Sequence, residues 1–471
     1  NEAMLLDIRS GQTRRVALSP SRYGRFVADR NGEVNLIYGV NEKNFYDVYT
    51  RQGGKGAFTK LDGKHQGERF ITPFHAVNNG AYWAVGFGAD DKMGVYQWNS
   101  RNNTYTEVFR HDTVDASTVL TGPNEDVYAV RYHDHYPSYH YPDPKHPLAM
   151  AHAGVSKAFP SSDVRFINFS DNANKAVVLV SGPQQPTEFL IMDIKKNSLA
   201  PLLKSRPWLS ADDLVAMEPF ELVSRDGKKM RGFVSLPADK KKDLPFVVFP
   251  HGGPHGVQDT WRFNPEVQLL ASRGYGVMQI NYRGSGGMGW DFEAAGYREW
   301  GAAMQDDVTD ATKWLISEGM ADPKRLCIMG ASYVGYAALN AVAKEPDLYQ
   351  CAIGRVGVYD LPLMLSRGDI PQRTSGEAYL QRVLGSNLSE LRSRSPVHNA
   401  EKIKAKVFLA HGEQDRRVPV EHAKRMRAAL EKAGNPPEWM LKRGEAHGFY
   451  ADDNQVELYN RILAFLKKHI G

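Results

Sequence analysis

The sequence predicts two domains of different class: an all-β domain of short repeats over residues 1–210, and a doubly wound α/β domain with a mostly parallel sheet over residues 211–471. Two patterns carry this prediction. Short β-like runs recur at a nearly constant spacing in the first part, and apolar strand patterns alternate with amphipathic helix patterns in the second. With 471 residues, of which 42% are apolar and 24% charged, the chain can bury two substantial cores.

The repeats of the first domain are marked by polar turn signals followed by strand-like residues. These marks fall at Val34, Ala81, Val127 and Ala176, at intervals of 46 to 49 residues. Such a period of short β-runs is typical of β-propeller blades, and residues 4–11 resemble only the end of a blade, so the sequence predicts about four blades plus a remnant. An incomplete propeller would expose strand edges. We therefore expect that a missing N-terminal propeller fragment, or a second copy of the chain in a homo-oligomer, covers them.

The boundary between the two domains is expected near residues 205–220, where Pro201, Pro207 and Pro219 punctuate the segment after the last blade. A β-hairpin is expected first, with strands at 220–224 and 230–236. The alternating pattern that follows predicts a mostly parallel sheet with helices on both faces. Its clearest members are a buried strand at 277–280, a helix at 306–317 and a closing amphipathic helix at 455–469.

A serine between a strand pattern and a helix pattern is the most informative feature of this domain. Ser332 follows the apolar run 325–329 and precedes the helical spacing of 337–343, as in a nucleophile elbow, where a tight strand-to-helix turn exposes a serine hydroxyl. Val334 stands where the G-x-S-x-G pattern has its second glycine, and a β-branched side chain should crowd that turn. We therefore expect Val334 to move the helix away from the strand and to weaken an oxyanion donor at Tyr333. The rate would fall while the fold is kept.

The two partners of a catalytic triad follow in the order expected for this fold. Asp415 comes after the strand pattern 406–410, and His447 comes after the strand pattern 439–441. Loops at strand ends are where open α/β sheets carry their chemistry. A serine hydroxyl needs a neutral imidazole to take its proton, and the imidazole needs a carboxylate to fix its tautomer. The sequence thus predicts Ser332 as nucleophile, His447 as general base and then acid, and Asp415 as the orienting carboxylate.

A glycine-rich loop supplies the expected oxyanion hole. The buried strand pattern 246–250 runs into the loop 251–256, which has the form of the HGGG-type loops that donate a backbone N–H. We expect the N–H groups of Gly253 and of Tyr333, the residue after the nucleophile, to face the developing oxyanion.

Two further residues are candidates for binding substrate. His251 opens the glycine-rich loop, and Arg355 lies beside an apolar strand. Arg355 could hold either a substrate carboxylate or a structural acid, and the sequence leaves both alternatives open.

These motifs together resemble the catalytic domain of the prolyl oligopeptidase family of serine peptidases, over residues 215–471. The glycine-rich loop and the segment 281–287 are most similar to the acylaminoacyl-peptidase and dipeptidyl-aminopeptidase branch. The motifs that carry the resemblance are residues 251–256, 281–287 and 300–307, the Ser332 elbow, and the loops of Asp415 and His447.

The resemblance implies an α/β-hydrolase fold preceded by a propeller that admits oligopeptides and excludes folded proteins. It implies a serine peptidase that cleaves amide bonds of short peptides. Two alternatives stay open: a carboxylesterase that uses the same triad, and a catalytically impaired homologue because of Val334.

Several other classes of function and site are not expected. The net charge of +5 is spread along the chain, so no nucleic-acid interface is indicated. No apolar run approaches the length of a membrane span. The histidines between residues 133 and 146 have no common zinc spacing and stand among prolines, so we expect a long irregular loop there, with no metal and no cofactor. Cys327 and Cys351 are expected to be buried free thiols. A cytoplasmic location is favoured, with the periplasm or secretion left open.

Overall fold

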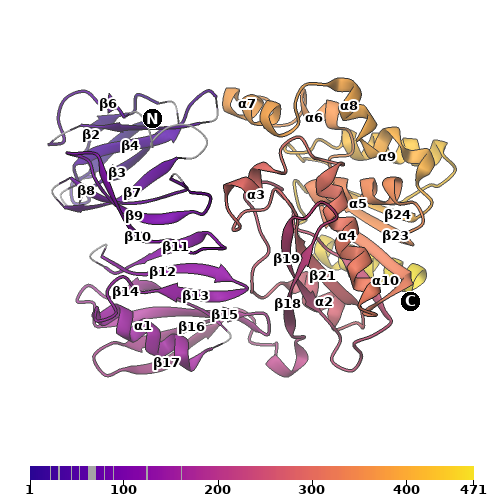
Figure 1. Cartoon of the computed structure of the whole chain (residues 1–471), viewed down its shortest axis with the longest axis horizontal. Coiled ribbons are helices and arrows are strands. Elements are labelled where there is room, and N and C mark those ends of the chain that lie inside the picture. The colour runs from indigo at the N-terminus through magenta and orange to yellow at the C-terminus, as the bar shows by residue number, and fades with distance from the viewer. Residues whose placement is uncertain are drawn as a thin grey trace. The chain divides into compact units, whose positions relative to one another are not determined.

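The computed structural model describes the chain except for residues 22, 30, 31, 44, 52, 62–69, 79, 89, 124, 125 and 161. The described residues form two compact units (Figure 1). The β unit comprises Asn1–Ser181, Thr187–Ser205 and Gly287–Asp291, and the α/β unit comprises Gly182–Pro186, Arg206–Gly286 and Phe292–Gly471. Within the described part of the chain, no helix combines the length and the apolar character needed to cross a bilayer.

The β unit is a series of antiparallel sheets in which strands that follow one another in sequence are also neighbours in the sheet (Figure 1). Two strands form the first sheet, β11 to β13 form a sheet of three, and the other sheets have four strands. Such meanders are the building units of β-propellers. The strands are β1 (Glu2–Leu6), β2 (Thr13–Leu18), β3 (Arg25–Ala28), β4 (Val34–Val40), β5 (Tyr46–Thr50), β6 (Thr59–Lys60), β7 (Ile71–Asn78), β8 (Ala81–Gly86), β9 (Gly94–Asn99), β10 (Thr104–Phe109), β11 (Ala116–Thr121), β12 (Val127–Asp134), β13 (Tyr136–His140), β14 (Asp163–Phe169), β15 (Lys175–Gly182), β16 (Gln185–Asp193) and β17 (Ser198–Lys204).

The repeat marks found in the sequence all lie at one place in these sheets. Val34, Ala81 and Val127 are the first residues of β4, β8 and β12, and Ala176 is the second residue of β15. Each is the second strand of its sheet, where residues such as Leu36 and Ala84 are fully buried. The period in the sequence is therefore the period of the sheets.

The histidine-rich segment is a hairpin, so the prediction of a long irregular loop was wrong for its first part. Strands β12 and β13 pair with each other, and His135 makes the turn with a φ of 63°. Pro137 is compatible with a strand because β13 lies at the edge of its sheet. After six irregular residues the chain enters helix α1 (Pro147–Ala158). The described residues contain no group of three or more His, Cys, Asp or Glu side chains placed to hold a metal ion.

The α/β unit is built on one eight-stranded sheet with the order β18-β19-β21-β20-β22-β23-β24-β25. The predicted hairpin is present as β18–β19. It joins β21 antiparallel, and all pairs from β21 to β25 are parallel. The strands are β18 (Met217–Val223), β19 (Lys229–Ser235), β20 (Leu244–Val248), β21 (Gly276–Asn281), β22 (Ala321–Ala331), β23 (Cys351–Arg355), β24 (Lys406–Gly412) and β25 (Glu438–Lys442). The α-helices are α2 (Pro265–Ala271), α3 (Trp290–Ala294), α4 (Ala303–Ser317), α5 (Tyr333–Lys344), α6 (Leu361–Met364), α7 (Thr374–Val383), α8 (Leu388–Ser393), α9 (Glu421–Lys432) and α10 (Asp452–Ile470), and short 3₁₀ turns lie at Ala211–Asp213, Pro396–His398 and Ala400–Lys402.

Helices cover both faces of this sheet. Val248 of β20 belongs to the core that contains α4, α5 and α9, whereas its neighbour Val247 belongs to the core that contains α2 and α10. Both valines are completely buried, which is expected of a parallel strand with helices on either side. Burying such a side chain stabilises the fold by about 1.5–3 kcal/mol. The predicted doubly wound α/β class is confirmed.

The two cysteines form a disulfide, so the prediction of free thiols was wrong. Cys327 of β22 and Cys351 of β23 are partners in the parallel register, with Cα atoms 4.7 Å apart. The sequence showed that both residues are buried, but it did not show that their strands are neighbours.

Candidate active site

Ser332 lies in a strained turn between a strand and a helix. It is the single residue between the end of β22 and the start of α5, with φ 60° and ψ −120°, a conformation that is costly for a residue with a Cβ atom. Its N–H donates to the carbonyl of Arg355 (2.9 Å), and its carbonyl accepts from the N–H of Tyr336 (3.2 Å). The backbone of the turn is thus satisfied, while the half-buried Ser332 hydroxyl makes no hydrogen bond within the described residues.

Val334 fits this turn because glycine stands four residues before it. A Cβ atom on Gly330 would lie 2.1 Å from Cγ1 and 2.4 Å from Cβ of Val334, so the valine packs directly on the Gly330 backbone. Val334 itself is 1% exposed. Gly330 therefore supplies the space that a β-branched side chain needs, which removes the steric reason for a displaced helix; the effect of Val334 on turnover stays a prediction.

Gly335 has a separate packing role. A Cβ atom there would lie 2.7 Å from the Cα atom of Gly357 and 2.9 Å from the carbonyl oxygen of Arg355. Both contacts are with backbone, which cannot move aside as a side chain can. Helix α5 can approach the end of β23 this closely only because residue 335 is glycine.

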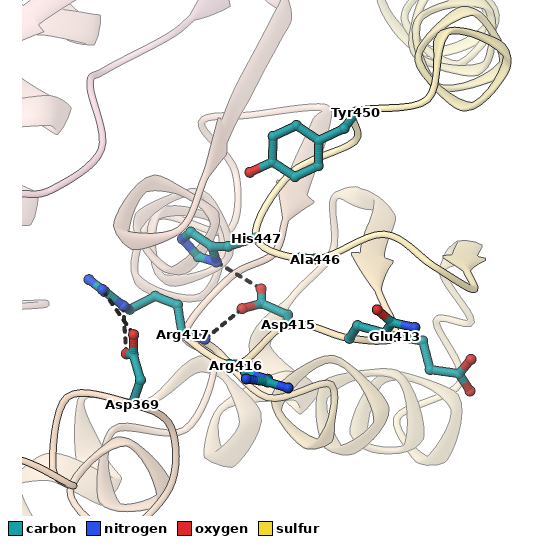
Figure 2. Close-up of a pocket in the computed structure, with 9 residues that line it drawn as sticks. Asp369, Glu413, Asp415, Arg416, Arg417, Ala446, His447 and Tyr450 are labelled. Carbon is teal, nitrogen blue, oxygen red and sulfur yellow. Dashed lines mark hydrogen bonds and ion pairs between the residues drawn. The ribbon is translucent and has the colours of Figure 1, made fainter. Parts of the chain in front are cut away.

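Asp415 and His447 are joined as a triad requires. The Asp415 side chain is completely buried in the loop after β24, and its Oδ2 lies 2.7 Å from Nδ1 of His447 (Figure 2). Its Oδ1 accepts from the N–H groups of Arg417 and Val418, both at 2.9 Å. A carboxylate at Nδ1 holds the proton there and leaves Nε2 free to accept the proton of a nucleophile.

An open pocket of about 820 Å³ lies beside this pair (Figure 2). Tyr450 stands on one side of His447, and an ion pair between Arg417 and Asp369 stands on another (Figure 2). The residues that line the pocket are Asp369, Glu413, Gln414, Asp415, Arg416, Arg417, Ala446, His447 and Tyr450.

Ser332 is not hydrogen-bonded to His447 within the described part of the chain, although the sheet brings the three residues to one edge. Ser332, Asp415 and His447 follow β22, β24 and β25, which run parallel in a continuous row with β23. Their carboxyl ends therefore meet at the same edge, where ligands bind in open α/β sheets. Catalytic hydrogen bonds are often long before substrate binds, so this arrangement is compatible with a triad.

The two expected oxyanion donors both have unused N–H groups. Tyr333 is the first residue of α5, so its N–H has no partner in the helix, and the helix has no side-chain cap. The loop after β20 passes close to the elbow, since a Cβ atom on Gly252 would lie 3.3 Å from the carbonyl oxygen of Ala331. Neither the N–H of Gly253 nor that of Tyr333 has an acceptor among the described residues.

The side chain of His251 supports the glycine-rich loop from inside the protein. Its Nε2 lies 2.8 Å from Oγ of Ser285, and its ring stacks on Tyr282 with the ring centres 4.7 Å apart. The Tyr282 hydroxyl donates to the His251 carbonyl (2.8 Å). Burial lowers the pKa of His251. These contacts fix the loop that carries Gly253; a role of His251 in binding substrate stays a prediction.

Arg355 is paired with a structural acid, one of the alternatives left open by the sequence. Its guanidinium forms a two-pronged ion pair with Glu266 of α2, in which Nη1 meets Oε1 and Nη2 lies 2.9 Å from Oε2. The hydroxyl of Tyr459 in α10 donates to the same carboxylate (2.6 Å). Although burial opposes it, the charge of Arg355 holds the pKa of Glu266 below its usual value. Burial, together with the Glu266 charge, raises the pKa of Tyr459 to about 12, so its hydroxyl stays a donor.

Sequence reasoning missed the acids that hold these elements together. Glu266 lies 89 residues from Arg355 in the chain, and no local pattern connects them. Glu445 is also missed: it is 2% exposed and lies two residues before His447. A carboxylate next to a loop that the sequence predicts to be catalytic was the available signal in that case.

Known proteins resemble the chain in sequence and in fold. Residues 261–471 match the model of the prolyl oligopeptidase family. Dipeptidyl aminopeptidase BIII of Pseudoxanthomonas mexicana is 32% identical over 308 residues, which are 63% of this chain and 44% of that protein. Dipeptidyl peptidase family member 6 of Caenorhabditis elegans is 25% identical over 97% of this chain and 66% of its own length. The chain thus spans less than two thirds of either relative.

Solved structures agree on the fold. A puromycin-hydrolyzing peptidase of Mycobacterium tuberculosis superposes with a TM-score of 0.80, covering 98% of this chain and 72% of that one, at 20% identity. An acylaminoacyl peptidase of Pyrococcus horikoshii gives a TM-score of 0.73 at 17% identity, covering 99% of this chain and 73% of that one. The predicted combination of a β-propeller region with an α/β-hydrolase domain is confirmed. The chain carries, in residues 261–471, a domain of the prolyl oligopeptidase family.

Proposed function

We propose that the chain is a serine peptidase that hydrolyses amide bonds of short peptides through an acyl-enzyme on Ser332. The observation that carries the proposal is the 2.7 Å contact between Asp415 Oδ2 and His447 Nδ1, at the same sheet edge as a serine in a strained elbow. The resemblance to a dipeptidyl aminopeptidase and to acylamino-acid-releasing enzymes supports peptides as the substrate class.

The first half of the reaction forms the acyl-enzyme. Nε2 of His447 takes the proton of the Ser332 hydroxyl while Oγ bonds to the carbonyl carbon of the scissile amide. The negative charge on the former carbonyl oxygen is met by the N–H groups of Gly253 and Tyr333. When the tetrahedral intermediate collapses, the C–N bond breaks and the imidazolium gives its proton to the departing amine.

The second half releases the acyl group. His447 takes a proton from water, the resulting hydroxide bonds to the ester carbon, and the Ser332 oxygen leaves with the proton returned by the imidazolium. Asp415 lies against Nδ1 of His447 and stabilises each imidazolium, while its hydrogen bonds from the N–H groups of Arg417 and Val418 hold the carboxyl group in place.

Two measurements test the proposal. Peptide anilides and p-nitrophenyl esters should both be turned over; cleavage of esters with no cleavage of peptides would make the chain a carboxylesterase instead. A fluorophosphonate should label the chain, and the label should be lost in Ser332→Ala. An unlabelled chain would show a site that no longer works and would refute the proposal. Ser156→Ala, which changes a serine of α1 in the β unit, is the matched control and should leave labelling intact.

A further inference from the structure

Three side chains near the elbow, one of them buried and two half-buried, take no direct part in the proposed chemistry. They are Arg355 at the end of β23, Glu266 in the first turn of α2, and Tyr459 in α10. The guanidinium and the phenol converge on one carboxylate, so the three form a single connected network. A buried ion pair is poor evidence of added stability. Its position suggests another role, because it ties three elements to the point where the nucleophile is held.

The network holds the turn on which Ser332 rests. The carbonyl of Arg355 accepts a hydrogen bond from the Ser332 N–H (2.9 Å). A movement of the Arg355 backbone would therefore change the position of Ser332 relative to the sheet. The next residue, Val356, has a φ of 43°, an unfavourable value for a buried β-branched residue. Such conformations persist only where the surroundings enforce them. The two-pronged contact of Arg355 with Glu266 is positioned to do so.

The loop that carries the histidine is tied to the same helix. The Glu445 carboxylate accepts hydrogen bonds from the N–H of Tyr450 (2.7 Å), the N–H of Ala451 (3.1 Å) and the amide of Asn454 (2.6 Å). These donors lie at the start of α10, so the loop around His447 closes onto its first turn. Asn454 and Tyr459 are five residues apart on that helix, about 7.5 Å along its axis.

We propose that Glu266, Arg355 and Tyr459 are positioning residues that, through α10, hold Ser332 at a fixed place relative to His447. The inference rests on the proposed function. No hydrogen bond joins the Ser332 hydroxyl to His447 among the described residues, so their relative placement has to come from the scaffold. A misplacement of about 1 Å can cost roughly a hundredfold in rate.

The experiment compares turnover in two variants that loosen the network. Tyr459→Phe deletes one hydroxyl, and Glu266→Gln removes the charge while keeping the shape. We expect kcat for a peptide anilide to fall about tenfold to a hundredfold in each, with KM nearly unchanged, because the substrate contacts stay in place.

A matched control separates positioning from general loss of stability. Tyr349→Phe also deletes a buried tyrosine hydroxyl, the one that lies 2.8 Å from Oγ1 of Thr312. Tyr349 precedes the amino end of β23, opposite to the end that carries Arg355. It should lower Tm to a similar degree and leave kcat as it is.

The outcomes are distinguishable from failure of the proposed function. Fluorophosphonate labelling of the unmodified chain, lost in Ser332→Ala, together with its turnover of the peptide anilide, decides that function before any network variant is measured. In a chain that labels, a selective fall of kcat in the network variants supports the inference. An unchanged kcat, or a fall no larger than that of Tyr349→Phe, overturns it. Should Glu266→Gln not fold, Tyr459→Phe alone decides, since it removes a single oxygen from a half-buried side chain.

Discussion

Replacing Gly330 by alanine should displace the nucleophile elbow. The new methyl carbon would lie 2.1 Å from Cγ1 and 2.4 Å from Cβ of Val334. Carbon atoms pack at about 3.5–4.0 Å, so α5 would have to retreat by more than about 1 Å. Overpacking of this kind lowers the free energy of unfolding by about 1–3 kcal/mol. Because α5 begins at Tyr333, the shift would also move Ser332 and an oxyanion donor, and kcat/KM should fall by roughly a hundredfold.

A double-mutant cycle with Val334→Gly tests the cause. Alone, Val334→Gly removes a side chain that is 1% exposed and places glycine in a helix, which together cost about 3 kcal/mol. In the double variant the alanine methyl enters the space that the valine leaves. The cost should therefore be about 1–3 kcal/mol below the sum of the two single costs. Val334→Ala is the matched control, because it keeps the Cβ atom at 2.4 Å and should give little relief.

Urea denaturation gives the free energies of unfolding, and hydrolysis of a p-nitrophenyl ester gives kcat/KM. Costs that add within about 0.5 kcal/mol would refute the steric argument. So would a Gly330→Ala variant with unchanged kcat/KM. A rise of turnover in Val334→Gly would instead restore the expectation, made from the sequence, that this valine holds the helix away from the strand.

Three other substitutions have expected outcomes that follow from single contacts. Asp415→Asn should lower kcat by about 10⁴, because the imidazole would be held in the wrong tautomer. A fall of kcat no larger than that caused by Asp→Asn at an exposed position would exclude Asp415 from the triad. Gly335→Ala should lower the free energy of unfolding by about 1–3 kcal/mol in urea, because its Cβ meets the backbone of Gly357 at 2.7 Å, and an unchanged value would show that the approach is not tight. At Glu445 burial opposes the charge, but the three hydrogen bonds outweigh it and hold the pKa below 4.5. The ionised Glu445 therefore stabilises the fold fully above its pKa in the unfolded chain, and this stabilisation is lost as the pH falls through its pKa in the folded chain. The Tm of Glu445→Gln should thus fall less steeply than that of the unmodified chain below about pH 4.5. Curves of Tm against pH that run parallel for the two proteins would contradict this.

The features that could be predicted from the sequence are those carried by short stretches of chain. The elbow at Ser332 and the loops of Asp415 and His447 each consist of a strand pattern and its next few residues. Parallel strands then bring such loops to one edge, whatever their separation in sequence. For the same reason the repeat period predicted the sheets of the β unit, since each meander is local.

The features that were missed depend on which distant elements are neighbours. The disulfide needs β22 beside β23, and the acid that pairs with Arg355 comes from α2, 89 residues away. Val334 is different, because its explanation was local. Gly330 stands four residues before it, near the end of β22, and the G-x-S-x-G pattern has glycine at both positions because both need space. A missing second glycine can be tolerated when the first one gives the space to the larger side chain.

The elbow combines two costly backbone conformations on adjacent strands. Ser332 after β22 and Val356 after β23 both have positive φ, at about 1–3 kcal/mol each. Neither position is a glycine, which would adopt a positive φ without strain. The glycines are instead at Gly330 and Gly335, where the missing side chains let α5 pack closely against both turns. Two supports therefore maintain the strained conformations: the packing of α5 against the turns and the ion pair of Arg355 with Glu266. A substitution that loosens either support allows the turns to relax before the sheet unfolds, so such variants should lose turnover at temperatures well below their Tm.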